Sequence, residues 1–224
     1  MTTDSSTVPQ SLFVFVNLND PVCYHNLSKT NCMISSGLII ASVDPAFLQH
    51  YLSGSADYLP FLPNAQRSLS SISLFCHEIT YLYDLEYDAE LARCHAFRLA
   101  PSRLSSLFAF GSMQDCQRAH QVYGWHLSTV RRFTLKADPL TRVARVNMEV
   151  VSLMRGLYHR TNLDSKDKHR IWTHYWGGGG DIQVEAPVFQ NGVLERNLIS
   201  SGVLWEYLVE GRLNLAEPLH QASP

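Results

Sequence analysis

The feature that most constrains this chain is a run of four glycines, Gly177 to Gly180, followed by the short segment Gln183-Val184-Glu185. Side chains on a strand alternate between its two faces, so Gln183 and Glu185 are expected on one face and Val184 on the other. An amide beside a carboxylate is suited to holding a sugar hydroxyl and orienting a second reactant. The same spacing also describes an ordinary amphipathic edge strand.

The composition is that of a globular protein with room for a substantial core. The chain has 224 residues, of which 46% are hydrophobic and 17% are charged. Residues 1–10 are polar and lack the basic and apolar regions of a signal peptide, so we expect a flexible leader over 1–10 and a single domain over 11–224. The longest apolar-leaning run, 32–43, is too short to cross a membrane.

The cysteines and histidines indicate neither a disulfide framework nor a metal centre. The five cysteines include no CxxC pair, and the ten histidines form no HExxH motif. Reduced thiols in a chain without a visible signal peptide favour the cytoplasm. We therefore expect a cytoplasmic protein that binds neither a metal nor a membrane.

The net charge of −2 conceals a local basic block. Residues 131–170 contain ten Lys and Arg against four Asp and Glu, a local excess of +6. Such a block on a nearly neutral protein is suited to contacting phosphate, although an ordinary solvated face has the same composition.

Apolar, β-branched and aromatic runs predict strands at 11–16, 93–99, 104–110, 129–135, 144–151, 203–209 and 213–215. Helices are predicted at 45–52 after the N-cap Asp44, at 113–123 between Ser112 and Gly124, at 194–199, and over part of 152–174. Strands mixed irregularly with helices indicate an α+β fold. Neither a GxGxxG after a strand nor a GxxxxGK[ST] occurs, which excludes Rossmann and P-loop sites.

Three stretches carry a resemblance to a known superfamily. Pro101 to Phe110, followed by a helix from Ser112, is similar to the serine-rich central strand and helix of ADP-ribosyltransferases. Tyr175-Trp176 followed by Gln183-Val184-Glu185 resembles the catalytic strand of that superfamily, with its Gln-x-Glu ending. The residues after Glu185 are similar to the bacterial nucleic-acid-modifying members. The resemblance covers roughly residues 98–200.

The resemblance implies a split mixed β-sheet core flanked by helices, with NAD as the substrate and no metal. The positive charge that develops on the ribose as nicotinamide leaves is stabilised by an ionised carboxylate. The resemblance assigns this role to Glu185, while Gln183 positions the acceptor. Glu206, within Leu204-Trp-Glu-Tyr-Leu208, is the competing carboxylate and ranks second, because it lacks the Gln two residues earlier.

The superfamily also implies a set of NAD-binding residues. It expects an Arg or His on the first strand, where this chain has Asn17. Arg103, beside the serine pair, is the preferred substitute, and Arg98 is the other candidate. The full set of expected NAD contacts is Asn17, Arg98, Arg103, Ser105, Ser106, Phe108 and Tyr175.

The acceptor expected by resemblance is a nucleic acid. Gln in the Gln-x-Glu motif accompanies amides, thiols or nucleobases rather than arginine. The glycine run would then be a mobile acceptor-recognition loop, and the basic block would guide a phosphate backbone to it. The expected contacts are Trp176, Gly178, Arg160, Lys168 and Arg170.

The sequence therefore leads to an NAD-dependent ADP-ribosyltransferase acting on RNA or single-stranded DNA, as a toxin or phage-defence effector with an antitoxin protein as its partner. Three alternatives stay open: transfer to a protein side chain, hydrolysis of NAD, and a catalytically silent interaction module of the same fold. The absence of a first-strand Arg or His favours the last of these.

Overall fold

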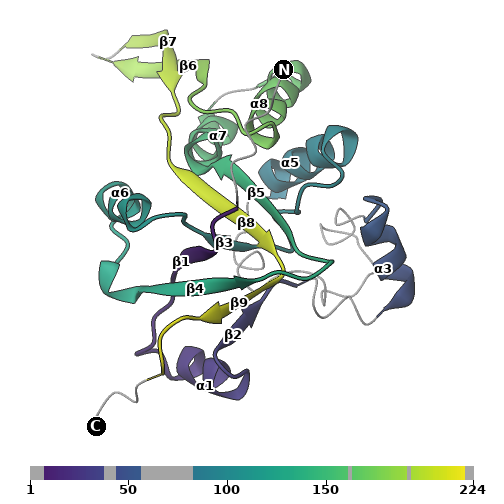
Figure 1. The fold of residues 1–224 in the computed structure, drawn as a ribbon. Coiled ribbons are helices and arrows are strands. Elements are labelled where there is room, and N and C mark those ends of the chain that lie inside the picture. The colour runs from purple at the N-terminus through teal and green to yellow at the C-terminus, as the bar shows by residue number, and fades with distance from the viewer. Residues whose placement is uncertain (1–7, 38–43, 57–82, 161–162, 191–192, 220–224) are drawn as a thin grey trace.

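The computed structural model describes residues 8–37, 44–56, 83–160, 163–190 and 193–219, and it is an α+β structure built from antiparallel sheets (Figure 1). Its strands are β1 (Ser11–Phe15), β2 (Met33–Ser35), β3 (Leu107–Ala109), β4 (Val130–Lys136), β5 (Arg142–Asn147), β6 (Gln183–Gln190), β7 (Val193–Ser200), β8 (Trp205–Glu210) and β9 (Arg212–Leu215). Its helices are α1 (Pro21–Lys29), α3 (Pro45–Leu52), α5 (Tyr83–Ala96), α6 (Met113–Tyr123), the short 3-10 helix η4 (Leu127–Thr129), α7 (Met148–Arg160) and α8 (Ser165–Trp176).

Two sheets meet near the middle of the molecule. One has the strand order β1-β4-β9-β2 and the other has the order β3-β8-β5. Their edge strands are joined by a bridge in which the amides of Phe13 and Phe110 donate to each other's carbonyl oxygens at 2.8 and 2.7 Å. This bridge places the middle of β1 beside the residue that follows β3, from which the chain leads into α6.

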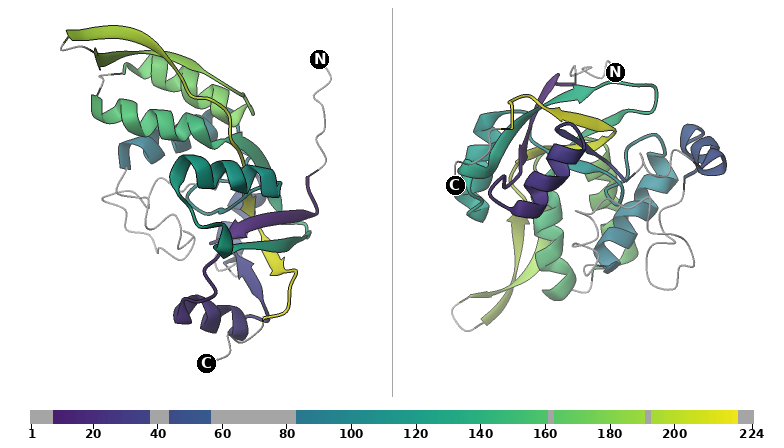
Figure 2. Two further views of the ribbon diagram at one scale, coloured as in Figure 1. Left: turned by 90° about the vertical axis from the view of Figure 1, so that its left-hand side faces the viewer. Right: turned by 90° about the horizontal axis from the view of Figure 1, so that it is seen from below.

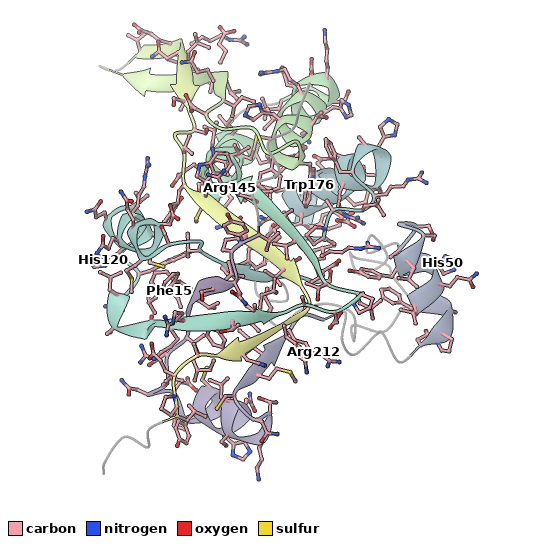
Figure 3. All side chains as sticks on the ribbon, viewed as in Figure 1. Phe15, His50, His120, Arg145, Trp176 and Arg212 are labelled. Carbon is pink, nitrogen blue, oxygen red and sulfur yellow. The ribbon has the colours of Figure 1, made fainter. Side chains whose placement is uncertain are left out.

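Helices α5, α7 and α8 pack together beside β5 and β8, as Figures 1 and 2 show. The largest cluster of buried apolar side chains lies between these elements, and it includes Leu85, Ala89, Val150, Met154, Trp172, Tyr175, Trp176 and Leu208. Figure 3 shows Trp176 among the three helices. None of the helices in the described part of the chain is long and apolar enough to span a membrane.

The hairpin formed by β6 and β7 extends away from the two sheets (Figures 1 and 2). The side chains of Ile182, Val184 and Ala186 are buried in the core beside the helices, on the inner face of the hairpin. Gln183 and Glu185 point to the opposite, outer face and are exposed. The predicted alternation of side chains along this strand is therefore confirmed.

Helix ends follow the predicted capping residues. Asp44 caps α3 by accepting hydrogen bonds from the next two free backbone amides, and Ser112 caps α6 by accepting one from Asp115 N. Gly124 ends α6 with φ of 72°, a left-handed conformation that glycine adopts without a steric penalty.

Three predicted elements are wrong. The segment 93–99 was predicted as a strand, but α5 runs through Ala96, because Leu85, Ala89 and Ala92 recur at helical spacing and face the core. Residues 194–199 are strand β7 rather than a helix, since β7 pairs residue by residue with β6. The strand predicted to continue to 151 ends at Asn147, where α7 begins.

The glycine run forms a hydrogen-bonded helix end rather than an open loop. The amides of Gly177, Gly178 and Gly179 donate to carbonyl oxygens in the last turn of α8, at 2.9 to 3.1 Å. Gly178 has φ of 71°, and a Cβ on Gly179 would lie 2.4 Å from the ring of His174. The left-handed φ of Gly178 favours glycine, and Gly179 leaves room for the His174 ring, which is a different role from the mobile loop predicted. Residues 1–7 of the expected leader lie outside the described residues.

Candidate functional site

A cavity of about 390 Å³ lies where the two sheets meet. Its walls come from β1, β3 and the turn before it, β8, the first two turns of α7, and the end of α6 with the residue after its cap. The lining residues are Val14, Phe15, Arg103, Leu107, Phe108, Phe110, Tyr123, Trp125, Met148, Val151, Ser152, Arg155 and Glu206. We call this the junction cavity. An apolar cavity with a few convergent polar groups is the usual form of a small-molecule site.

One end of the junction cavity is aromatic. The ring of Phe15 makes edge contacts with Phe110 at 5.8 Å and with Trp125 at 5.2 Å, and Tyr123 stacks on Trp125 at 5.4 Å. Figure 3 labels Phe15, which is the last residue of β1. Trp125 is 37% exposed, so this end opens to solvent. Such walls are suited to holding a planar heterocycle by stacking.

The cavity wall also carries a buried carboxylate and a buried guanidinium. Glu206 on β8 is 6% exposed, and its Oε1 lies 3.4 Å from Nη1 of Arg103, which is 3% exposed. Arg103 also makes a two-point contact with Glu86 of α5, at 3.0 and 3.2 Å, and donates to the hydroxyl of Tyr175 at 2.7 Å. One guanidinium thus serves two carboxylates.

The shared guanidinium and the burial of the site both affect the pKa of Glu206. Burial raises the pKa of Glu206, and the charge of Glu86 adds to the effect, while Arg103 and Arg155 oppose it. Burial also raises the pKa of Tyr175, against the opposing effect of Arg103. A carboxylate at the wall of an apolar cavity with a raised pKa is a frequent property of functional sites.

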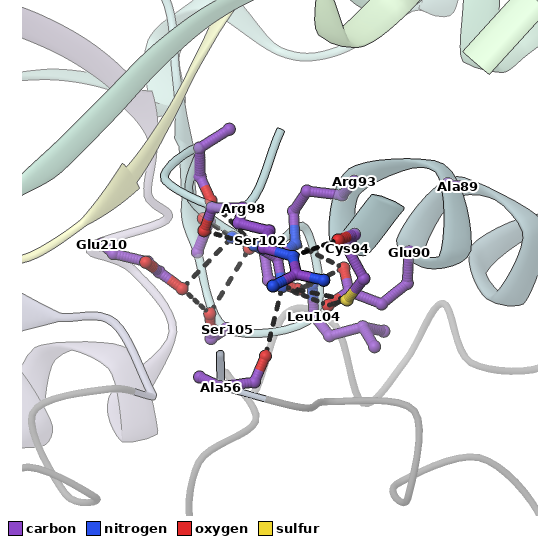
Figure 4. A network of polar contacts seen from close by, with 12 residues as sticks. Ala56, Ala89, Glu90, Arg93, Cys94, Arg98, Ser102, Leu104, Ser105 and Glu210 are labelled. Atoms are coloured by element: carbon purple, nitrogen blue, oxygen red, sulfur yellow. Dashed lines mark hydrogen bonds and ion pairs between the residues drawn. The ribbon is translucent and has the colours of Figure 1, made fainter. Parts of the chain in front are cut away.

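A second buried network supports the turn that carries Arg103, and Figure 4 shows its members Glu90, Ser102, Ser105 and Glu210. Arg103 stands in a turn in which Ser106 N donates to Ser102 O at 3.0 Å. Glu210 accepts hydrogen bonds from Ser102 N and from the hydroxyl of Ser105. The hydroxyl of Ser102 donates to Glu90 at 2.8 Å, which links this turn to α5. The position of Arg103 is therefore fixed from two sides.

Ser105 and Ser106, predicted to contact NAD, belong to this supporting network. Both are fully buried, and the hydroxyl of Ser106 donates to Ser102 O at 2.6 Å. Neither lines the junction cavity. Of the other expected NAD contacts, Arg103 and Phe108 line the cavity, and Tyr175 lies behind Arg103 in the core.

Asn17 and Arg98, the remaining expected NAD contacts, are exposed and lie away from the cavity lining. The side chain of Asn17 accepts a hydrogen bond from Asn19 N, and Arg98 Nε donates to Cys94 O. Both contacts are local. The structure therefore brings Arg103 and Phe108 together with Glu206, but not with Asn17 or Arg98.

Gln183 and Glu185 also lie outside the cavity lining, on the exposed face of the β6–β7 hairpin. Glu185 pairs across the hairpin with Leu198, which is exposed too. The carboxylate that the structure places with Arg103 is Glu206, which the sequence pattern ranked second.

The residues expected to contact nucleic acid are dispersed. Lys168 forms an ion pair with Asp88 at 2.9 Å, and Arg170 lies 3.9 Å from Asp167. Trp176 is buried and donates to Ala89 O at 2.7 Å. Gly178 belongs to the turn after α8, and Arg160 is the last residue of α7.

Sequence reasoning missed the cavity residues that follow α6 and those on α7. Tyr123 and Trp125 flank the predicted cap Gly124, and two aromatic side chains at a helix end were a signal for a contact surface. Ser152 and Arg155 are three residues apart and so share one face of α7. This helical spacing could not be recognised from the sequence, because the residues at the start of α7 have the composition of a strand.

A second cavity of about 450 Å³ lies between α5 and α8, lined by Asp88, Leu91, Ala92, His95, Ser165, Lys168, His169 and Trp172. Its two closest opposite charges, Asp88 and Lys168, already neutralise each other. It has one large aromatic wall residue, Trp172, whereas the junction cavity has five. The junction cavity is therefore the stronger candidate site.

Within the described residues, no group of three His, Cys, Asp or Glu side chains is placed to hold a metal ion. A scan against protein-family models gives no match for this chain, and a search of curated proteins also gives none. The assignment of function therefore depends on the geometry of the junction cavity.

Proposed function

We propose that the junction cavity binds the nicotinamide ribose part of NAD, and that the protein transfers ADP-ribose from NAD to a nucleic-acid base. Nicotinamide leaves as a neutral base, and positive charge develops on the ribose as the glycosidic bond stretches. A fixed carboxylate next to that ribose stabilises the charge where it appears. In this proposal Glu206 is that carboxylate.

The observation that carries the proposal is the position of Glu206. Its carboxylate lies on the wall of an aromatic cavity and is held at 3.4 Å by a guanidinium that is itself fixed. The nicotinamide ring would stack among Phe15, Tyr123 and Trp125, with its ribose towards Glu206. Two sheets that meet at the site support the split core of an ADP-ribosyltransferase-like fold. The expectation of a mixed sheet is wrong for the described strands, whose pairings are all antiparallel.

A nucleic acid is the acceptor we propose, because the region 131–170 carries an excess of positive charge. The exposed side chains of Lys166 and Arg170 place part of this charge on α8. Unpaired bases in RNA or single-stranded DNA expose the reacting atom. The biological role proposed with this activity is that of a toxin or phage-defence effector held in check by an antitoxin protein.

A specific observation favours a second candidate, a ligand-binding module without catalysis. Arg103 is engaged by Glu86, Tyr175 and Glu206, so its charge supports the fold in the absence of any ligand. A cavity assembled in this way can bind a nucleotide without cleaving it. The two candidates differ in whether nicotinamide is released.

The test is incubation of the protein with NAD labelled in its adenylate half, together with RNA, single-stranded DNA or cell lysate, while released nicotinamide is measured. Glu206→Gln keeps the size and hydrogen-bonding capacity of the side chain but removes its charge. Loss of one preorganised charge-stabilising group lowers the rate about 10²- to 10³-fold. Glu185→Gln is the matched control on the exposed hairpin, and we expect it to retain the wild-type rate.

The outcomes separate the candidates. Label in RNA or DNA that is lost in Glu206→Gln supports the proposal, and label in protein moves the acceptor to a side chain. Nicotinamide release without label in any macromolecule indicates NAD hydrolysis. Binding of NAD without nicotinamide release supports the module without catalysis. A rate that falls in Glu185→Gln but not in Glu206→Gln would refute the assignment of the carboxylate.

A further inference from the structure

Arg155 is a second guanidinium on the wall of the junction cavity, and its environment differs from that of Arg103. It lies on α7, and its Nε is buried without a hydrogen-bond partner. Among the described residues, no carboxylate forms an ion pair with Arg155. Buried donors are nearly always paired, so an unpartnered Nε on a cavity wall indicates a place where a ligand acceptor can bind.

The wall around Arg155 is polar and faces the cavity. Ser152 stands one turn earlier on the same face of α7, and its hydroxyl is 2.6 Å from the hydroxyl of Tyr123. The Tyr123 hydroxyl also donates to Glu149 at 3.0 Å. Tyr123, Ser152 and Arg155 all line the cavity. The positive charge on this wall is that of Arg155, while the hydroxyls are engaged with each other.

The charge of Arg155 acts inside the same cavity as Glu206. Arg155 lowers the pKa of Glu206, against the larger raising effect of burial, so the two side chains interact electrostatically. The other guanidinium of the cavity, Arg103, is occupied by two carboxylates. An anionic ligand group in this cavity would therefore pair with Arg155 rather than with Arg103.

We propose that Arg155 binds a phosphate group of the ligand, and that the junction cavity selects phosphorylated ribosides over the corresponding free ribosides. This inference rests on the proposed function, because it concerns the ligand of the same site. It gives helix α7 a basic contact to the nucleotide, whereas the resemblance expects a basic NAD contact from an Arg or His on the first strand. The ring then occupies the aromatic end, the ribose lies at Glu206, and the phosphate lies at Arg155.

The test compares two ligands that differ by one phosphate, nicotinamide mononucleotide and nicotinamide riboside. Dissociation constants are measured from the quenching of tryptophan fluorescence, with Trp125→Phe identifying the signal from the cavity. Loss of one charge-assisted hydrogen bond corresponds to about 10- to 100-fold in affinity. Wild type should therefore bind the mononucleotide about 10- to 100-fold more tightly than the riboside.

The variants are Arg155→Gln, Arg155→Lys and, as the matched control, Arg98→Gln at an exposed site outside the cavity. We expect the preference for the mononucleotide to fall to about onefold in Arg155→Gln, since the charged donor is lost. Arg155→Lys keeps a positive charge and should retain part of the preference for the mononucleotide. It also provides the comparison with wild type if Arg155→Gln does not fold. Arg98→Gln should bind both ligands as wild type does.

The possible failures are distinguishable. If wild type binds neither ligand, the proposed function fails and this inference fails with it. If wild type binds both ligands equally well, or if the preference persists in both Arg155 variants, the role of Arg155 is overturned while the proposed function stands. Inorganic pyrophosphate should compete with the mononucleotide in wild type, and absence of competition would also count against the phosphate contact.

Discussion

Replacing Arg103 with Met should reveal how much of the stability depends on the buried charges at the junction cavity. Arg103 is 3% exposed, and it stands between Glu86, which is 1% exposed, and Glu206, which is 6% exposed. Arg103→Met leaves two carboxylates buried without the guanidinium that they share. Removing one partner of a buried pair costs about 3–5 kcal/mol, and because two carboxylates lose their partner here, we expect about 5 kcal/mol.

Glu86→Gln should cost less, because Arg103 then keeps one carboxylate, Glu206, at 3.4 Å, and the new amide still accepts a hydrogen bond. The expected loss is about 1–3 kcal/mol, the range for hydrogen bonds to charged groups. The expected order of stability at pH 7 is wild type, then Glu86→Gln, then Arg103→Met.

The assay is urea and thermal unfolding followed by circular dichroism at pH 7 and at pH 5, with Arg98→Met as the exposed control. For a chain of this length a loss of 1 kcal/mol lowers Tm by about 2–4 °C, so Arg103→Met should lower Tm by about 10–20 °C. The loss should be smaller at pH 5, because burial raises the pKa of Glu206 and its protonation removes one unpaired charge. Equal stability of Arg103→Met and Arg98→Met would refute the buried charge network.

Three further predictions concern single residues. Gly179→Ala should destabilise the protein, because its Cβ would lie 2.4 Å from the ring of His174. Gly156→Ala on helix α7 has open space around the new Cβ, and it should raise the free energy of unfolding by about 0.5–1 kcal/mol, measured by thermal unfolding. Ser112→Ala removes the N-cap of α6 and should cost about 1 kcal/mol in urea unfolding, with no change if the cap is not formed. Burial raises the pKa of Glu206 in the folded protein, so folding favours its protonated form. The contribution of Glu206 to the free energy of unfolding is therefore fully present below the pKa of the unfolded chain, about 4.3, and is lost as pH rises through the folded-state pKa. The stability of wild type relative to Glu206→Gln should therefore decrease from pH 4 towards pH 7, and a constant difference would contradict the raised pKa.

Local signals in the sequence were sufficient for several elements of the fold. The caps at Asp44 and Ser112 and the stop at Gly124 follow from hydrogen bonds within a few residues, so a pattern of residue types identifies them. The alternation around Gln183 and Glu185 is likewise a property of one strand. Such features need no knowledge of distant contacts.

The position of the candidate site could not be predicted in the same way. Glu206 lies in a strand of mostly apolar residues and resembles an isolated charge, and its partner Arg103 is about a hundred residues away in the chain. Glu185 shows the more suggestive local pattern, yet its face is exposed because the hairpin extends away from the sheets. Which carboxylate meets the guanidinium is decided by sheet pairing and not by neighbouring residues.

The glycine run shows a related effect. Four glycines in a row indicate a flexible loop when only chain entropy is considered. In the structure they close the end of α8 through backbone hydrogen bonds, and Gly179 lies against His174. The conformational freedom of glycine is used here to permit a close approach, which depends on a side chain from the preceding helix.

The central claim is that the junction cavity, with Glu206 on its wall, is the site of a pyridine nucleotide. A crystal structure of Glu206→Gln soaked with NAD tests this claim most directly, because the variant should bind NAD without cleaving it. We predict density for the nicotinamide ring among Phe15, Tyr123 and Trp125, with the ribose next to residue 206. Density for NAD on the outer face of the β6–β7 hairpin beside Glu185, with an empty junction cavity, would contradict the account.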